Sequence, residues 1–344
     1  MKKRSIISFI VLLAMLFTMV TISGIAAAPK KIVMKISHVS APGSARDIGC
    51  YKVKEVVEKM TNGLVTAQVY PSSQLGGQRD QVEGVQFGMI EMVVVPTSYL
   101  GGIQPLMTLL DTPFLLPEDP QTLYKLYQSD AIKQLLDTTK EKGIITLAIW
   151  QTGYKQYTAN KPLFSPTDMK GLKVRVMNSP ILFEQAKVLG AIPITMDFGE
   201  TYAALQNKTI DGQENPIDTI YDMKFHEVQT DITLTNHSTL DQVVMVNKKW
   251  FEGLDKEVQD AIVEGVRQGG IACLEATNAL IKRDTELILA TGKTKIHSLT
   301  KAQRDAWKKA LEPVQKFART SQGERGAKLF DLIVAEVAKL ENEK

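Results

Sequence analysis

The sequence lacks the motifs that mark most enzymes. Neither a G-x-S-x-G nucleophile elbow nor a Walker phosphate-binding loop occurs in its 344 residues. His226 begins a pattern like a zinc-protease helix, but Thr230 occupies the position of the second ligating histidine. The other histidines lack metal-ligand spacing, and we expect surface or hydrogen-bonded roles for His38, His237 and His297. We therefore expect no catalytic residues, no metal site and no cofactor.

Cysteine and net charge are also scarce. The two cysteines, Cys50 and Cys273, stand in separate expected helices, and spacing alone cannot place them at bonding distance. We expect two buried free thiols, and a disulfide stays open. Three of the 41 basic residues fall in the first 28 positions, which leaves 38 basic against 38 acidic residues. This balance gives no support for binding to nucleic acid or to a membrane surface.

The first 28 residues have the three-part layout of a secretory signal. A basic start at residues 2–4 precedes an apolar run over residues 6–20 and small residues up to Ala28. We expect cleavage after Ala28 and a periplasmic mature protein. The alternative is an uncleaved membrane anchor, because residues 6–28 are just long enough to span a bilayer.

The next part of the chain alternates strands and helices. Strands are expected at 32–36, 64–71 and 89–96, with helices at about 47–60 and up to Gly88. This order predicts a parallel α/β sheet. Residues 160–241 supply a second set of α/β elements, and a chain of this length usually divides into two lobes.

The last hundred residues read as helical. A long helix is expected from Lys256, with a kink at Gly269-Gly270, because glycine is unfavourable inside a helix. A second helix follows the capping box at Thr300, and Pro313 should bend it.

Arg175 is the strongest candidate for a binding residue. In the strand GLKVRV, apolar residues alternate with Lys173 and Arg175, and a helix follows at Ser179-Pro180. The end of a strand next to a helix N-terminus is a good place for an anion. On periodicity alone, Arg175 faces either water or a ligand. Its neighbours favour the ligand, because amides and aromatic groups can converge there with its guanidinium fork: Asn178, Phe198, Asn215 and, after the preceding strand, Lys155.

Several consecutive segments resemble the solute-binding subunit of tripartite ATP-independent periplasmic (TRAP) transporters, the DctP family. These segments are YPSSQLGGQ at 70–78, GLKVRVMNSP at 171–180, the stretch 189–216 ending in IDGQENP, and TNHSTLDQVVMVNKKW at 235–250. The resemblance implies an α/β, two-lobed periplasmic binding protein of type II-like fold. Hinge strands join the lobes and a long bent helix crosses both. We expect lobe I at 29–152 plus 241–280, and lobe II at 153–240 plus 281–344.

The resemblance also implies a binding site. Arg175 occupies the family's carboxylate-clamping position, Asn178 and Asn215 match positions that hydrogen-bond ligands, and Phe198 matches one that packs against them. Lys155 stands where the family often has a second arginine, so whether the ligand has one carboxylate or two stays open. Pro96 and Tyr99 replace charged residues of sialic-acid-binding members, which argues against that sugar acid. The remaining candidates are an aromatic pair and a histidine: Tyr99, Trp150 and His38.

These features predict an extracytoplasmic protein that captures a small organic acid by hinge closure. It would deliver the acid to the TRAP membrane subunits, a permease driven by an ion gradient, without chemistry on the ligand. An alternative is a ligand sensor that docks on a signalling receptor. A hydrolase or isomerase that uses cleft carboxylates ranks third. The ligand and the oligomeric state stay open.

Overall fold

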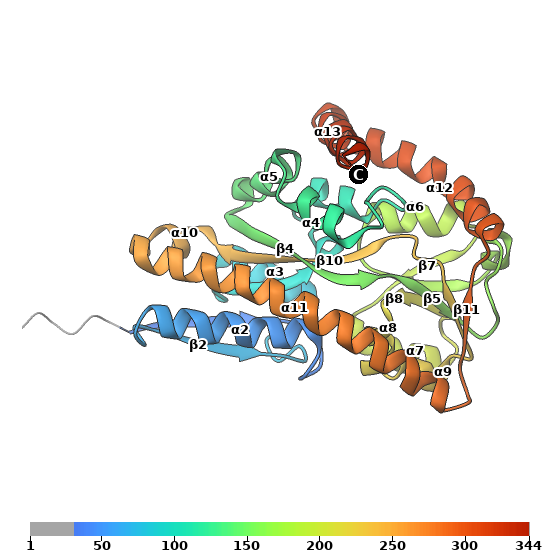
Figure 1. Cartoon of the computed structure of the whole chain (residues 1–344), viewed down its shortest axis with the longest axis horizontal. Coiled ribbons are helices and arrows are strands. Elements are labelled where there is room, and N and C mark those ends of the chain that lie inside the picture. The colour runs from blue at the N-terminus through green and yellow to red at the C-terminus, as the bar shows by residue number, and fades with distance from the viewer. Residues whose placement is uncertain (1–30, 344) are drawn as a thin grey trace, which may run out of the picture.

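The computed structural model describes residues 31–343, so the expected signal peptide lies outside the described residues. Two sheets organise the chain (Figure 1). Sheet A has five strands in the order β2-β1-β3-β10-β4, and sheet B has six in the order β11-β9-β5-β8-β6-β7. The predicted α/β class with two sets of strands is confirmed.

Sheet A contains β1 (Ile32–Ser37), β2 (Val65–Tyr70), β3 (Met92–Pro96), β4 (Ile144–Tyr154) and β10 (Thr239–Asn247). The first strand pairs in parallel with β2 and β3, which confirms the prediction from the strand-helix order. The late strand β10 enters between β3 and β4 and is antiparallel to both. Every residue of β3 and β10 is buried, as expected for strands covered on both faces.

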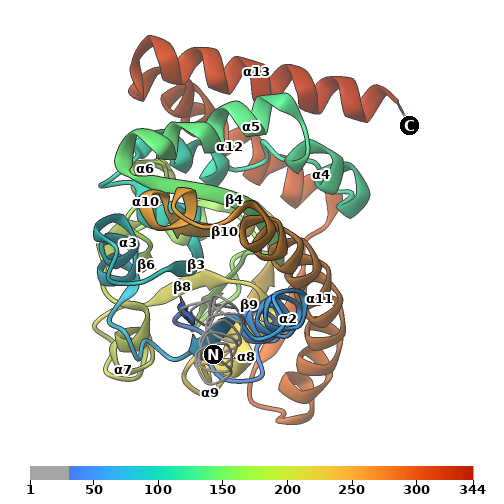
Figure 2. The same ribbon diagram turned by 90° about the vertical axis from the view of Figure 1, so that its left-hand side faces the viewer.

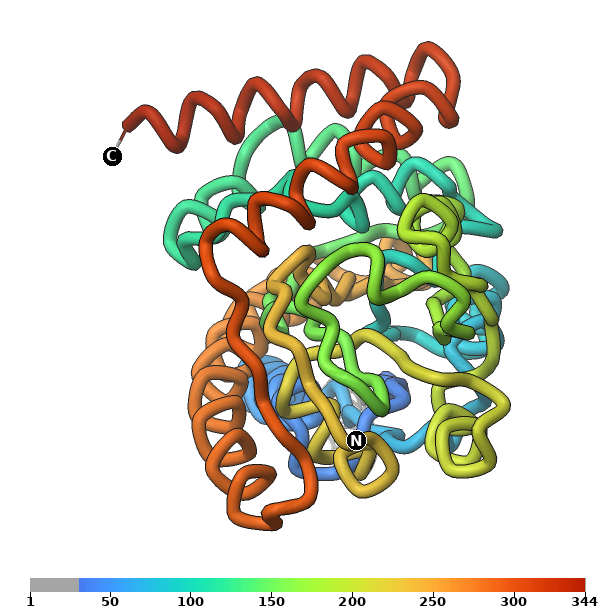
Figure 3. Tube along the Cα trace, turned by 90° about the vertical axis from the view of Figure 1, so that its right-hand side faces the viewer, coloured from blue at the N-terminus to red at the C-terminus, as the bar shows by residue number. Residues whose placement is uncertain are grey.

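Sheet B contains β5 (Gln156–Ala159), β6 (Lys173–Val176), β7 (Ile192–Thr195), β8 (Gly212–Asn215), β9 (Asp231–Leu234) and β11 (Lys295–Ser298). Strand β6 lies between β7 and β8 and is parallel to both. Strand β5 is antiparallel to β8 and β9. Figure 3 shows the chain running along the edge of this sheet through β11 before it reaches the C-terminal helices.

The α-helices are α2 (Ala45–Met60), α3 (Gln78–Phe87), α4 (Pro120–Tyr127), α5 (Asp130–Asp137), α6 (Pro180–Val188), α7 (Thr201–Gln206), α8 (Ile217–Asp222), α9 (Phe225–Val228), α10 (Lys248–Glu252), α11 (Lys256–Ala290), α12 (Lys301–Ser321) and α13 (Gly323–Asn342). Short 3-10 helices are η2 (Thr97–Leu100), η3 (Pro105–Asp111), η4 (Thr138–Lys142), η5 (Pro166–Met169) and η6 (Phe198–Glu200). The capping box at Thr300 and the left-handed glycine at Gly88 (φ 77°) confirm two predicted helix boundaries.

The chain crosses between the sheets three times. Lys155 separates β4 from β5, residues 235–238 separate β9 from β10, and α11 runs from sheet A to sheet B (Figure 1). The two strand crossings are joined by a hydrogen bond from the Lys155 amide to the Ser238 carbonyl oxygen (2.8 Å). The last helix, α13, packs against α4 and α5, which follow β3 in the chain (Figure 2).

Helix α11 is one continuous helix through Gly269-Gly270, where the sequence predicts a kink. The glycines serve close packing. A Cβ on Gly269 would lie 2.8 Å from the carbonyl oxygen of Gly49 in α2, and one on Gly270 would lie 2.8 Å from the Trp150 ring. Cys50 and Cys273 lie in this region as buried free thiols, as expected.

Candidate ligand-binding cleft

Arg175 lies at the end of β6 and is almost fully buried, with 2% of its surface exposed. Lys173 on the same strand is exposed, so the two basic residues do not share a solvated face. The Arg175 Nη2 donates hydrogen bonds to the Tyr99 hydroxyl (2.7 Å) and to the Met196 carbonyl oxygen (3.3 Å). Its Nε is buried without a partner. Part of the guanidinium fork is therefore unused by the described residues.

Phe198 and Tyr99 flank the Arg175 guanidinium. The carbon at the centre of the guanidinium lies 5.6 Å from the centroid of the Phe198 ring, a cation–π distance. Phe198 belongs to η6 beside sheet B, whereas Tyr99 belongs to η2, which directly follows β3 of sheet A. The predicted residues Arg175, Phe198 and Tyr99 thus come together between the two sheets.

The two predicted asparagines lie in different surroundings. Asn215 is buried at the end of β8, and its amide donates to the side chain of Gln213, the residue that pairs with Arg175 in the sheet. The side chain of Asn178 is exposed. The Asn178 carbonyl oxygen approaches Gly101 so closely that a Cβ there would lie 2.4 Å away.

Lys155 is buried in an internal ion pair and is not a free cation facing a ligand. Its Nζ lies 2.9 Å from Glu214 Oε1, and His237 Nε2 lies 2.7 Å from Glu214 Oε2. Burial alone would raise the pKa of Glu214, but the positive charge of Lys155 and the hydrogen bond from His237 hold that pKa well below its usual range. These three residues link both strand crossings to β8.

Trp150 lies in the interior beside sheet A, away from Arg175. Its indole donates to the Val266 carbonyl oxygen (3.1 Å) and packs on Gly270. His38 is buried just after β1, with Nε2 3.1 Å from Asp47 Oδ1, and burial lowers the pKa of its imidazole. Its Nδ1 has no partner. The contacts of the Trp150 indole with α11 keep that residue out of the cluster around Arg175.

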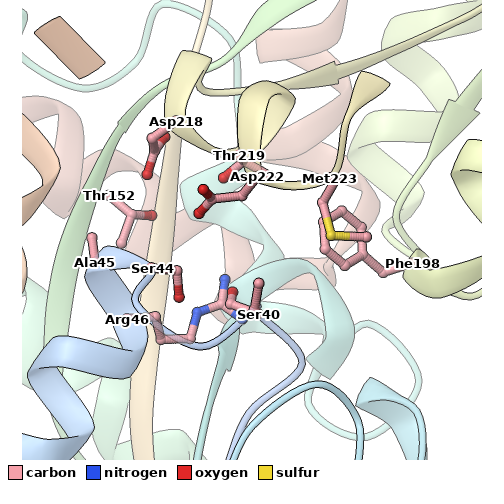
Figure 4. Close-up of a pocket in the computed structure, with 11 residues that line it drawn as sticks. Ser40, Ser44, Ala45, Arg46, Thr152, Phe198, Asp218, Thr219, Asp222 and Met223 are labelled. Carbon is pink, nitrogen blue, oxygen red and sulfur yellow. The ribbon is translucent and has the colours of Figure 1, made fainter. Parts of the chain in front are cut away.

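A small pocket opens between the two halves next to Phe198 (Figure 4). The first half contributes Ser40, Ala41, Ser44, Ala45, Arg46 and Thr152, and the second contributes Phe198, Asp218, Thr219, Asp222 and Met223. Burial raises the pKa of Asp218 to about 7 and that of Asp222 to about 6. Sequence reasoning missed Arg46, because an arginine at a helix start reads as an ordinary surface residue.

Residues 36–321 match the family model for bacterial extracellular solute-binding protein, family 7 (DctP). The chain belongs to this family. It is 36% identical over 294 residues to the C4-dicarboxylate-binding periplasmic protein of Rhodobacter capsulatus, covering 84% of this chain and 86% of that one. It is 34% identical over 238 residues to the 2,3-diketo-L-gulonate-binding periplasmic protein of Escherichia coli, covering 69% and 72%.

Solved structures of family 7 relatives confirm the two-lobed fold. A TRAP periplasmic solute-binding protein from Desulfovibrio salexigens with bound orotic acid has a TM-score of 0.87 and 37% identity, covering 90% of this chain and 100% of that one. One from Shewanella oneidensis with bound succinate has a TM-score of 0.84 and 32% identity, covering 89% and 99%. The resemblance to TRAP solute-binding subunits predicted from the sequence is confirmed.

Two further observations concern the described residues of this family 7 chain. Over residues 31–343, no helix is long and apolar enough to cross a membrane. In the same range, no group of three or more metal-ligating side chains is arranged to hold a metal ion. The groups that converge in the cleft are hydrogen-bond donors, acceptors and aromatic rings, which suit the binding of a small polar molecule.

Proposed function

We propose that this protein binds a small carboxylic acid between its two lobes and delivers it to the membrane subunits of a TRAP permease. The observation that carries the proposal is the buried Arg175 guanidinium with an unused Nε. A guanidinium fork matches a carboxylate in geometry and charge. Relatives that bind C4-dicarboxylates, succinate or orotic acid support the same ligand chemistry.

Capture proceeds by closure of the lobes, with boundaries near residues 152, 240 and 280. Arg175, Phe198 and Asn215 contribute from sheet B, and Tyr99 contributes from the sheet A side. A ligand that contacts both lobes binds the closed form more tightly and so raises its population. The permease then recognises the closed arrangement of the lobes, and the ligand is released unchanged.

Delivery to a permease requires export. The leader at residues 1–28 directs the chain to the periplasm, where cleavage near Ala28 releases it. This location agrees with the relatives from Rhodobacter capsulatus and Escherichia coli, whose names describe periplasmic proteins.

The test is calorimetric titration of Arg175→Ala and Arg175→Lys after a thermal-shift screen of mono- and dicarboxylates, keto acids and sugar acids. A ligand at a hundred times its dissociation constant adds about 2.7 kcal/mol of stability, which the screen detects. Removing one side of a desolvated ion pair costs about 3–5 kcal/mol, so Arg175→Ala should bind at least about a hundredfold more weakly. Lysine should also bind weakly, because it lacks the fork.

Arg267→Ala is the matched control. Arg267 is an exposed arginine on α11 that pairs with Glu264, and its loss should leave the affinity unchanged. Wild-type affinity in Arg175→Ala would show that Arg175 does not hold the carboxylate.

A further inference from the structure

One nitrogen of the Arg175 guanidinium is already fully used by groups of the protein. Its Nη2 donates to the Tyr99 hydroxyl (2.7 Å) and to the Met196 carbonyl oxygen (3.3 Å), which accounts for both hydrogens of that nitrogen. Nε is buried without a partner, and Nη1 donates to no residue within 31–343. The guanidinium therefore has two nitrogens free and the third engaged.

A carboxylate that pairs with this guanidinium through two hydrogen bonds needs the engaged nitrogen. Bidentate pairing uses two neighbouring nitrogens with parallel N–H bonds, either Nε and Nη2 or Nη1 and Nη2. The Cδ methylene of the arginine separates Nε from Nη1, so these two cannot hold one carboxylate together. An incoming carboxylate must therefore displace either the Tyr99 hydroxyl or the Met196 carbonyl oxygen from Nη2.

Tyr99 is the acceptor that can leave. The Met196 contact is the longer one, but its oxygen belongs to the backbone between β7 and η6, and it cannot withdraw unless that segment moves. The Tyr99 hydroxyl is the end of a half-buried side chain that reaches Arg175 from η2, on the other side of the cleft. Rotation of this side chain withdraws the hydroxyl and leaves the backbone in place.

The backbone of η2 is held firmly behind Tyr99. Asp111 Oδ1 accepts hydrogen bonds from the hydroxyls of Thr97 (3.1 Å) and Ser98 (2.7 Å), the two residues that precede Tyr99. All three of these polar residues are buried. The approach of the Tyr99 side chain to the guanidinium is therefore fixed at its base, and the hydroxyl can return to the same place after a ligand leaves.

We propose that the Tyr99 hydroxyl is an internal competitor of the ligand, which occupies the place of one carboxylate oxygen on Arg175 and is displaced when the acid binds. This inference rests on the proposed function and adds a residue that sets its affinity. Binding then exchanges one acceptor for another, so the acid gains less than it would at a bare guanidinium. The carboxylate prevails because it brings a negative charge, whereas the hydroxyl is neutral. On release, the returning hydroxyl keeps the buried Nη2 supplied with an acceptor.

The first test is calorimetric titration of Tyr99→Phe, which removes the hydroxyl and keeps the ring. The probes are succinate, L-malate and orotate, which are bound in structures of relatives, and any other acid that the earlier screen finds. Each acid that binds wild type should bind the variant at least about threefold more tightly, because no hydroxyl has to be displaced. A tyrosine whose hydroxyl only contacts the ligand would give the opposite result.

The second test follows the melting temperature. Ligand-free Tyr99→Phe should melt below wild type, because Arg175 loses an acceptor. The same change should not lower the melting temperature of Arg175→Gln, where the guanidinium is absent. In saturating ligand, wild type and Tyr99→Phe should melt together, because the hydroxyl no longer contacts Arg175 in the complex. A hydroxyl with a structural role elsewhere would keep the two proteins apart with or without ligand.

Tyr51→Phe is the matched control. Tyr51 lies on α2 with 50% of its surface exposed, and loss of its hydroxyl should change neither the affinity nor the melting temperature. A crystal structure of the complex gives the direct observation. It should show a carboxylate oxygen on Arg175 Nη2 and the Tyr99 hydroxyl beyond hydrogen-bond distance from that nitrogen.

The outcomes separate this inference from the proposed function. Unchanged or weaker binding in Tyr99→Phe would overturn the competitor, while the proposed function stands. A melting-temperature difference that persists in the complex, or a complex in which the hydroxyl and the carboxylate both contact Nη2, would do the same. If no carboxylic acid from the screen binds wild type, the proposed function itself fails, and the competitor has no ligand to oppose.

Discussion

The close packing of α11 on α2 predicts that alanine in place of a glycine destabilises the protein, although helix propensity favours alanine. Helix propensity alone would stabilise Gly269→Ala by about 1 kcal/mol, because alanine is the better helix former. The new methyl group would lie 2.7 Å from Val53 Cγ2 and 2.8 Å from both the Gly49 carbonyl oxygen and Trp150 Cζ2. A backbone oxygen cannot rotate aside, so the helices must separate.

Overpacking of this kind costs about 1–3 kcal/mol. The shift also strains the hydrogen bond from the Trp150 indole to Val266, which contributes about 1 kcal/mol. After subtraction of the gain in helix propensity, we expect Gly269→Ala to lose about 1–3 kcal/mol in free energy of unfolding. Gly270→Ala should lose less, because its closest neighbour is a side chain, the Trp150 ring, which can yield.

Urea unfolding of the ligand-free protein, followed by circular dichroism, measures this difference. Gly102→Ala is the control, since a Cβ there meets no atom within 4 Å, and its stability should stay within about 0.5 kcal/mol of wild type. An unfolding midpoint for Gly269→Ala at or above that of wild type would refute the reasoning. It would mean that helix propensity outweighs the close approach.

Three other predictions concern buried charges and the contact between the lobes. Glu214→Gln leaves Lys155 buried and unpaired, so urea unfolding at pH 7 should show a loss of about 3–5 kcal/mol. Because the folded-state pKa of Glu214 is depressed, the extra stability of wild type over Glu214→Gln should diminish as pH falls below about 4.3. If the free energy of unfolding changes with pH equally in both proteins, the pairing is contradicted. Burial raises the folded-state pKa of Asp218 to about 7, so its ionisation destabilises the fold as pH rises. In thermal unfolding, Asp218→Asn should therefore stabilise the protein by up to about 4 kcal/mol at pH 8 and by less than about 1 kcal/mol at pH 4. Gly101→Ala places a methyl group 2.4 Å from the Asn178 carbonyl oxygen, so ligand affinity should fall at least about tenfold, and unchanged calorimetric binding would rule out a tight contact there.

Local features of the fold were predictable from the sequence. Strands β1, β2 and β3, the stop at Gly88 and the capping box at Thr300 depend on residues close in the chain, and each is found as predicted. The role of Gly269-Gly270 was less predictable, because it depends on residues far away in the chain. The glycines do weaken a helix, but the Trp150 ring and α2 fill the space that they leave.

Features of the cleft that depend on distant residues were harder to predict. Lys155 was expected to face a ligand, but its partner Glu214 is 59 residues away in the chain. Trp150 has the aromatic character of a pocket residue, but alternation in β4 does not say which face meets α11. Arg46 gave no signal, because its burial results from the other half of the chain closing over it.

The position of β10 has a consequence for the order in which the protein assembles. This strand separates β3 from β4, so sheet A cannot form as one sheet until residues 239–247 have joined it. A nascent chain that ends before this segment has only β2-β1-β3 paired, with the edge of β3 open. Most of the chain must therefore be synthesised before the first lobe can fold. Contacts across such long sequence separations slow folding, so the first lobe should be the slower of the two to complete its sheet.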